Sequence, residues 1–179
     1  MVVLSSPPMS TASPVLVGAG ALPELVMRDA TTALAQQCRR PLLLHATGEC
    51  PQTVLSETAA RPEFVRLSGD AAVLHPSGGS WLEALADWQR PVLLLVNTRP
   101  DGGIPGSAAA YNALADRWRV PLIGLVQLGG DWTSADRIRD GLPWCGWIPQ
   151  PLHPLREQAL TAVAQRLLSS ATTAGFGSV

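Results

Sequence analysis

Short apolar runs alternate with segments of helical periodicity along most of the chain. The runs are bounded by proline, glycine or asparagine, which is typical of buried β-strands. The segments between them place apolar residues three or four positions apart, as amphipathic helices do. This alternation indicates repeated β-α-β units. The strands expected from the clearest runs are 14–17 (PVLV), 41–48 (PLLLHATG), 91–97 (PVLLLVN) and 120–128 (VPLIGLVQL).

Other segments predict elements with a weaker pattern. Residues 71–75 (AAVLH) are expected to form a buried strand, 63–67 (EFVRL) an edge strand and 141–149 (GLPWCGWIP) a last short strand. The first helix is expected to follow the turn 18–24 and to end near Arg39. Further helices are expected over 81–89, 107–118, 135–140 and 154–170, with a short helix or irregular stretch over 51–60.

The apolar runs are continuous rather than alternating, so the strands are expected to be buried on both faces. That pattern favours a mostly parallel sheet covered by helices on each side. The fold class predicted is therefore α/β, a three-layer α/β/α arrangement that is P-loop-NTPase-like or Rossmann-like. Residues 91–97 are the most apolar run and the candidate for the central strand.

In such sheets ligands bind outside the carboxyl ends of the strands. The loops that follow the expected strands are rich in glycine, serine, threonine, aspartate and histidine, although tight turns require these residue types anyway. The candidate ligand-binding residues in or beside these loops are Gly18, Gly20, His45, Gly78, Gly79, Asn97, Arg99 and Asp101.

Length and composition indicate one well-buried globular domain. The chain has 179 residues, of which 46% are hydrophobic and 15% charged. We place the domain at 14–170, with a flexible leader at 1–13 and a disordered tail at 171–179. No apolar run is long enough to cross a bilayer. Three cysteines without a C-x-x-C pair support neither a disulfide framework nor a zinc cluster, so we expect a cytoplasmic protein.

Charge excludes several classes of function. The net charge is −1 and there is no basic patch, which argues against nucleic-acid binding. All 13 basic side chains are arginine, so the chain contains no lysine. A Schiff base, a lysine general base and a lysine bridging two phosphates are therefore excluded.

The order of segments resembles a known branch of the P-loop ATPases. The matching stretches lie within 70–149 and read AAVLHPSGG, PVLLLVNTR, VPLIGLVQL and GLPWCGWIP. They are similar to the later half of the branch that contains dethiobiotin synthetase, cobyrinic acid synthase and the MinD and ParA partitioning ATPases. The N-terminal unit also has the length of that branch's first strand, loop, helix and second strand. The resemblance implies a P-loop scaffold.

The motif that defines that branch is missing here. A P-loop reads G-x-x-x-x-G-K-[ST], with glycines that expose backbone N–H groups, a lysine that bridges phosphates and a hydroxyl that binds magnesium. The equivalent stretch keeps Gly18 and Gly20, but Pro23 lacks an N–H group and Glu24 brings a negative charge. The same stretch fails as a dinucleotide fingerprint, because Pro23 stands where the third glycine is needed and the second strand ends in His45.

A competing interpretation is a small serine hydrolase. Ser77 lies between an expected strand and an expected helix, as the nucleophile of a G-x-S-x-G elbow does, although His75 replaces the first glycine. Asp131 and His153 follow in the chain order of an α/β-hydrolase triad. The loop after the second strand would supply the oxyanion hole.

A metal site is the third interpretation. His45 and His75 end neighbouring expected strands, and Asp70 or Glu49 would complete a ligand set. Turn hydrogen bonds account for both histidines equally well. The three tryptophans Trp132, Trp144 and Trp147 would either pack in the core or form an exposed anchor for a partner.

The function that we expect is a binding or assembly role. The chain would be a non-hydrolysing P-loop-like scaffold that binds an unknown small molecule or protein partner, with a homodimer as one arrangement. We expect no cofactor, no metal, no nucleic acid and no membrane partner. Whether the chain is an enzyme stays open, with Ser77, Asp131 and His153 as the catalytic residues of the alternative.

Overall fold

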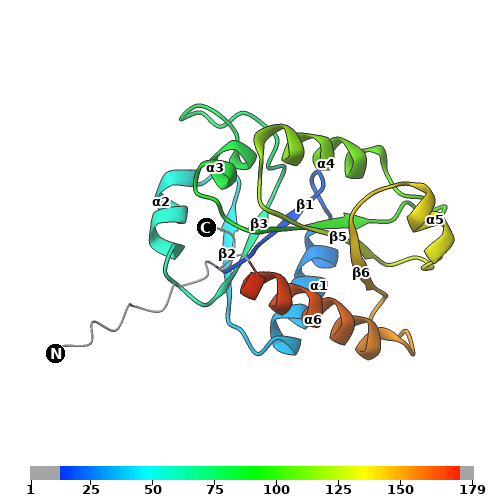
Figure 1. Cartoon of the computed structure of the whole chain (residues 1–179). Coiled ribbons are helices and arrows are strands. Elements are labelled where there is room, and N and C mark those ends of the chain that lie inside the picture. Colours follow the sequence, from blue (N-terminus) through cyan, green and yellow to red (C-terminus); the bar gives the residue numbers. More distant parts are fainter. Residues whose placement is uncertain (1–12, 174–179) are drawn as a thin grey trace.

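Six parallel strands form the central sheet, in the order β2-β3-β1-β4-β5-β6 (Figure 1). The computed structural model describes residues 13–173. Every strand pairing is parallel, which confirms the predicted sheet. The most apolar run lies at its centre beside β1, as expected. The strands are β1 (Val15–Gly18), β2 (Leu42–Ala46), β3 (Phe64–Ser68), β4 (Val92–Asn97), β5 (Leu122–Leu128) and β6 (Trp144–Ile148).

Helices cover both faces of this sheet. Helices α1 and α6 pack on one face, and α2, α3 and α4 pack on the other (Figure 1). The three-layer α/β/α architecture is thus confirmed. The helices are α1 (Glu24–Gln37), α2 (Pro51–Thr58), α3 (Trp81–Asp87), α4 (Gly106–Trp118), α5 (Ser134–Arg139) and α6 (Arg156–Thr173).

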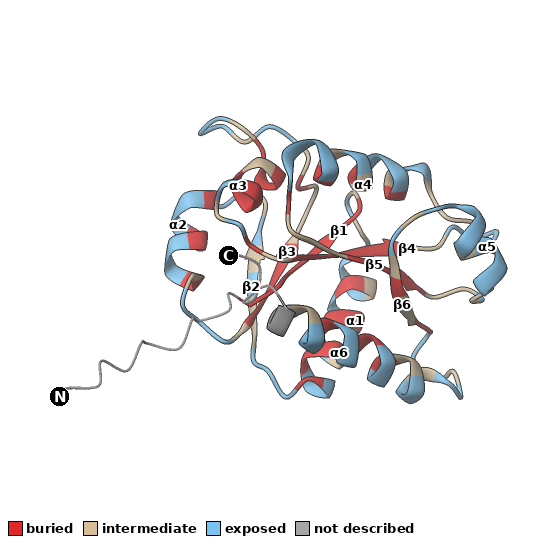
Figure 2. Cartoon of the chain, viewed as in Figure 1, coloured by how far each residue is buried: buried red, intermediate tan, exposed pale blue. Residues whose placement is uncertain are grey.

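Strand alternation divides the core into two hydrophobic clusters. Successive side chains of a strand point to opposite faces, so Leu94 of β4 faces α3 and α4 whereas Leu93 and Leu95 face α1 and α6. Figure 2 shows the buried residues along the strands and on the inward sides of the helices. Burial on both faces is the reason that β1 and β4 read as continuous apolar runs, whereas β2 lies at the edge and none of its residues is fully buried.

Three helix-to-strand connections share one backbone design. Arg39, Gln89 and Arg119 each follow a helix and adopt positive φ angles of 52°, 48° and 58°. In each connection one residue and then a proline come next, before the following strand begins. The left-handed residue ends the helix, and the proline prevents its continuation. The design returns the chain to the amino edge of the sheet.

The strand predicted over 71–75 is wrong. Residues 69–80 form a loop with a single antiparallel bridge between Leu74 and Ser80. Val73 and Leu74 are 60% and 76% exposed, so this run is apolar but not core. The third strand is 64–68 instead, and it lies inside the sheet between β2 and β1 rather than at the edge. The expected edge position is therefore also wrong.

The termini of the expected domain lie close to the described range. Helix α6 continues to Thr173, and the remainder of the predicted tail, 174–179, lies outside the described residues, as does most of the predicted leader. None of the helices within residues 13–173 is long and apolar enough to cross a membrane.

Candidate functional site

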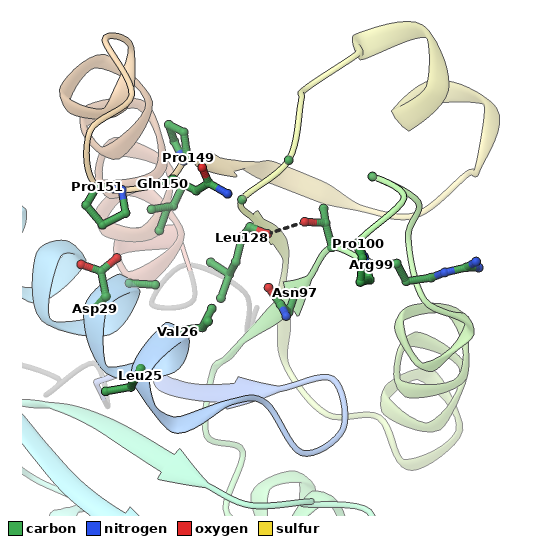
Figure 3. A pocket seen from close by; sticks show the side chains of 16 residues that line it. Leu25, Val26, Asp29, Asn97, Arg99, Pro100, Leu128, Pro149, Gln150 and Pro151 are labelled. Carbon is green, nitrogen blue, oxygen red and sulfur yellow. Dashed lines mark hydrogen bonds between the residues drawn. The ribbon is translucent and has the colours of Figure 1, made fainter.

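A cleft lies over the carboxyl ends of β4, β5 and β6, beside the first turns of α1 (Figure 3). Its inner chamber has a volume of about 510 Å³. Because all strands are parallel, the loops that follow them meet at this edge, as predicted for ligand sites. The side chains that define the inner chamber are Leu25, Val26, Asp29, Asn97, Thr98, Arg99, Leu128, Ile148, Pro149 and Gln150.

The walls of the inner chamber are mostly apolar. Leu25 and Val26 of α1 form one side, and Leu128 and Ile148 close the floor. Leu25 is 68% exposed, although the other apolar side chains of α1 are buried or half-buried. An exposed apolar wall opposite strand ends is the common arrangement of small-molecule sites.

A few polar groups interrupt the apolar walls of the inner chamber. The side-chain amide of Asn97 makes no hydrogen bond within residues 13–173, and it lies beside the cavity in Figure 3. Thr98 Oγ1 donates a hydrogen bond to the Leu128 carbonyl oxygen at 3.1 Å, which ties the loop after β4 to β5. Asp29 is already paired, since its carboxylate lies 2.7 Å from Arg156 Nη2. The side-chain amides of Asn97 and Gln150, neither of which is hydrogen-bonded within residues 13–173, are thus available to a ligand.

A second, outer chamber opens beside the first. It has a volume of about 370 Å³ and shares Gly130, Pro149 and Gln150 with the inner chamber. Asp101 and Asp131 line it, as does His153. We refer to the two chambers together as the cleft.

The β1–α1 loop, which the resemblance equates with a P-loop, leads into a helix whose first residue is paired with β3. Glu24 is the first residue of α1, and its Oε1 accepts a hydrogen bond from Arg66 Nη2 at 2.7 Å. Ser68 Oγ lies 3.4 Å from the other carboxylate oxygen. A carboxylate at a helix N-terminus satisfies the same electrostatic preference as a bound anion.

Tyr111 of α4 connects the loop after β3 to the β1–α1 loop. The Tyr111 hydroxyl of α4 donates a hydrogen bond to Asp70 and accepts one from the Ala72 backbone N–H at 3.2 Å. Burial of the phenol, assisted by the bond to Asp70, raises the pKa of Tyr111, and the Gly20 backbone also reaches its hydroxyl. Asp70 is therefore committed to a protein partner and does not stand ready as a metal ligand.

The predicted hydrolase triad is not assembled. Asp131 and His153 line the same chamber, but Ser77 follows β3, which lies four strand positions from β6. At the usual strand spacing that separation is about 19 Å. His153 Nδ1 accepts a hydrogen bond from the Leu155 N–H at 3.1 Å, so it cannot donate to Asp131 as a triad histidine does. The hydrolase hypothesis was based on the order of these three residues along the chain, and that order does not bring them together in the fold.

Ser77 has a different partner. Its hydroxyl lies 2.6 Å from His75 Nδ1, and His75 Nε2 lies 3.3 Å from the Gly48 carbonyl oxygen. Gly78 and Gly79 adopt positive φ angles in the same turn. These contacts hold an exposed turn together, and none of the residues lines the cleft.

The metal interpretation has no support from the geometry. His45 Nδ1 pairs with Glu49 Oε2 at 2.9 Å, whereas His75 is engaged in the turn around Ser77. The hydrogen bonds of Glu49 to His45 and to the Ala46 N–H lower the pKa of its carboxyl. Within residues 13–173, no group of three or more histidine, cysteine, aspartate or glutamate side chains is placed to hold a metal.

The three tryptophans pack against the protein instead of forming a free anchor. Trp132 and Trp144 meet edge to face with ring centroids 6.1 Å apart, and Arg137 lies 5.2 Å over the Trp144 ring. The Trp147 indole N–H donates to the Gly130 carbonyl oxygen at 3.1 Å. These contacts fold the loop that carries α5 onto the sheet edge.

The structure divides the candidate ligand residues into two groups. Asn97, Arg99 and Asp101 line the cleft, as sequence reasoning proposed for the loop after β4. Gly18, Gly20, His45, Gly78 and Gly79 belong to other loops of the same edge and line neither chamber. Whether either group binds a ligand stays a prediction.

Sequence reasoning missed the wall that α1 contributes. The pattern of Leu25, Val26, Asp29 and Ala30 places these residues on one helical side, next to the loop. It also missed Gln150, which follows the GWIP stretch. The sequence shows a leucine in the first turn of this helix, but its exposure depends on the strand ends that face it.

Comparisons with known proteins bear on the fold alone. The chain matches no protein-family model and no curated protein sequence. Its structure is similar to that of the MinD cell division protein from Aquifex aeolicus, with a TM-score of 0.50 and 11% sequence identity. The alignment covers 94% of this chain and 98% of that one. A likeness at this identity shows the fold alone, an α/β/α arrangement similar to that of MinD, and does not extend to activity.

Proposed function

We propose that this chain is a non-hydrolysing binding protein on a P-loop-like scaffold, which holds a small molecule in the cleft. On this proposal it is a degenerate relative of the branch that contains dethiobiotin synthetase and the MinD and ParA ATPases. It would have kept the sheet and lost the phosphate-binding loop. The observation that carries the proposal is the ion pair between Glu24 and Arg66 at the N-terminus of α1.

Three features of this loop oppose a bound triphosphate. The chain has no lysine to bridge phosphates. Pro23 offers no N–H group, and the N-terminus of α1 already carries the Glu24 carboxylate. A phosphate placed there would have to displace that carboxylate and would then meet its repulsion.

The cleft, by contrast, suits a largely uncharged ligand. Arg99, which lines it, pairs with Asp101 at 2.5 Å, and Asp29 of the inner chamber is neutralised by Arg156, which lines neither chamber. No free cation is left among the described residues that line the cleft to attract a phosphate. The apolar walls and the open amides of Asn97 and Gln150 favour a flat molecule with few hydrogen-bonding groups.

Magnesium and ATP test the first half of the proposal. We expect neither a thermal shift with millimolar Mg-ATP nor phosphate release above background. The control for contamination is a further chromatographic step, because a contaminating nucleotidase would separate from the protein. Phosphate release that co-elutes with the protein at constant specific activity would refute the non-hydrolysing role.

A flat neutral probe tests the second half. Indole titrated into ¹⁵N-labelled protein should shift the Asn97 side-chain amide. Leu25→Trp should weaken this effect several-fold by filling the inner chamber. Leu44→Trp is the matched control, since Leu44 is 60% exposed on β2 and lines neither chamber. Indole shifts confined to other residues would show that the cleft is not the site.

A further inference from the structure

The outer chamber holds one carboxylate that the protein does not neutralise. Asp101 is satisfied, because Arg99 Nη2 and the Gly103 N–H each bind one of its oxygens, at 2.5 Å and 2.9 Å. Asp131 is different. Its carboxylate makes no ion pair or hydrogen bond within residues 13–173, although its backbone carbonyl accepts from Gln127 at 3.0 Å.

The charges around the whole cleft therefore do not cancel. Arg99 and Arg156 are each held by an aspartate that lines the cleft, and Asp131 is the acidic side chain left over. His153 Nδ1 accepts a hydrogen bond from the Leu155 N–H, so this nitrogen makes no hydrogen bond to Asp131. The outer chamber thus has a net negative charge.

The position of Asp131 is held by the loop that carries it. Gln127 Nε2 donates to the carbonyl oxygens of Gly129 and Asp131, at 2.9 Å and 3.0 Å. Trp147 donates its indole N–H to the same loop. A carboxylate on such a braced loop offers a fixed partner to a ligand, with little ordering entropy lost on binding.

We propose that the outer chamber receives a positively charged group, so that the ligand of the cleft is a flat apolar molecule bearing an amine. The apolar body lies in the inner chamber and the amine reaches Asp131 through the opening at Gly130, Pro149 and Gln150, which both chambers share. This inference rests on the proposed function, because it takes the cleft to be the binding site.

Three indoles that differ in the charge of their side group provide the test. They are tryptamine, which is a cation, 3-methylindole, which is neutral, and indole-3-acetate, which is an anion. We expect tryptamine to bind up to about fivefold more tightly than 3-methylindole, the worth of one solvent-exposed ion pair. Indole-3-acetate should bind more weakly than both. High salt should reduce the advantage of tryptamine.

Asp131→Asn should remove that advantage and leave the affinity for 3-methylindole unchanged. Asp116→Asn is the matched control, because Asp116 is exposed on α4, away from the cleft, and its side chain has no partner within residues 13–173. Equal binding of tryptamine and 3-methylindole to the wild type would overturn the amine preference and leave the cleft intact. Failure of all three indoles to shift the Asn97 amide would overturn the proposed site as well.

Discussion

Arg66 and Glu24 form an ion pair across 42 residues of chain, in which the arginine is buried and the carboxylate is more than half exposed. Arg66 Nε and Nη1 have no hydrogen-bond partner within the described residues, so Glu24 is the one counter-charge of a buried cation. The pair joins the middle of β3 to the first residue of α1. It thereby connects the sheet to the end of the β1–α1 loop.

Glu24→Gln should destabilise the fold. The variant leaves a buried guanidinium without a counter-charge, although the amide oxygen of glutamine can still accept the hydrogen bond from Arg66 Nη2. Because a weaker form of that bond remains and Glu24 is partly exposed, we expect a loss of about 1–2 kcal/mol. Urea unfolding measures the change. Glu57→Gln, at an exposed position of α2, is the control and should shift the midpoint little.

Arg66→Met should be milder than Glu24→Gln. A methionine fills similar volume without a charge, and the Glu24 carboxylate can hydrate once its partner is gone. The two single variants therefore differ because one leaves a buried charge and the other leaves an exposed one. Greater destabilisation by Arg66→Met than by Glu24→Gln in the same urea experiment would contradict this account.

Arg119→Gly should stabilise the protein. Arg119 has a φ of 58° at the end of α4, a conformation that costs an ordinary residue about 1–2 kcal/mol. Glycine avoids this cost but loses more backbone entropy on folding, so we expect a net gain of about 0.5–1 kcal/mol. The melting temperature should rise accordingly.

Arg117→Gly tests the same charge change inside the helix. Arg117 lies in the last turn of α4, where glycine is about 1 kcal/mol less favourable than alanine. We expect a lower melting temperature for this variant. If the melting temperature rises for Arg119→Gly and falls for Arg117→Gly, the effect comes from backbone conformation. A fall in melting temperature for both would argue against the left-handed geometry at Arg119.

Gly124→Ala should destabilise β5. A Cβ at this position would lie 2.4 Å from Cys145 Sγ and 2.6 Å from the Pro143 carbonyl oxygen, at a φ of 149°. Relief requires movement of the β6 backbone, at a cost of about 1–3 kcal/mol. Gly48→Ala is the comparison, because a Cβ there meets no atom within 4 Å. Equal unfolding midpoints for the two variants would refute the steric argument.

The parallel sheet followed from the sequence because burial on both faces imposes a strong compositional pattern. Strands β1, β4 and β5 are continuous apolar runs, and each was found within a residue or two of its expected bounds. The loop after β4 was likewise predicted to lie at the functional edge. Its residues Asn97 and Arg99 do line the cleft.

The failures come from interactions between distant residues. Strand β3 contains Arg66, whose charge made the segment resemble an edge, and its partner Glu24 lies in another element. The apolar run around Val73 resembled a buried strand, yet the bond between Asp70 and Tyr111 holds the chain in a loop there. The pattern of residues along a segment does not show which distant residues that segment will contact in the fold.

The order of the strands across the sheet could not be predicted from the sequence either. Ser77, Asp131 and His153 appear in the order of a triad, but β3 lies on the far side of β1 from β6. The wall formed by Leu25 was hidden for a related reason, since its exposure depends on the strand ends that face it.

Cys50 should react faster than Cys38 and Cys145 with a thiol reagent such as DTNB near neutral pH. Cys50 is exposed, and hydrogen bonds from the Thr53 backbone and hydroxyl lower the pKa of its thiol. Burial raises the pKa of both Cys38 and Cys145. We expect one fast thiol in the folded protein and two more on unfolding, with Cys50→Ser removing the fast one. Retention of the fast reaction in Cys50→Ser would disprove the assignment.

Stability should fall as the pH rises above about 9, and Cys38 should account for part of the fall. Burial raises the pKa of this thiol from 9.0 to about 11, against the opposing charge of Arg40. Above pH 9 the unfolded chain therefore releases a proton that the folded chain keeps, so the unfolded state gains free energy of ionisation until the folded pKa is reached. Cys38→Ala should flatten the decline in urea midpoint between about pH 8 and about pH 10, whatever its effect on the midpoint itself. Cys50→Ala is the control, because the exposed Cys50 thiol, whose pKa is lowered, should contribute no such decline. An unchanged slope in Cys38→Ala would show that the Cys38 thiol ionises alike in the folded and unfolded states.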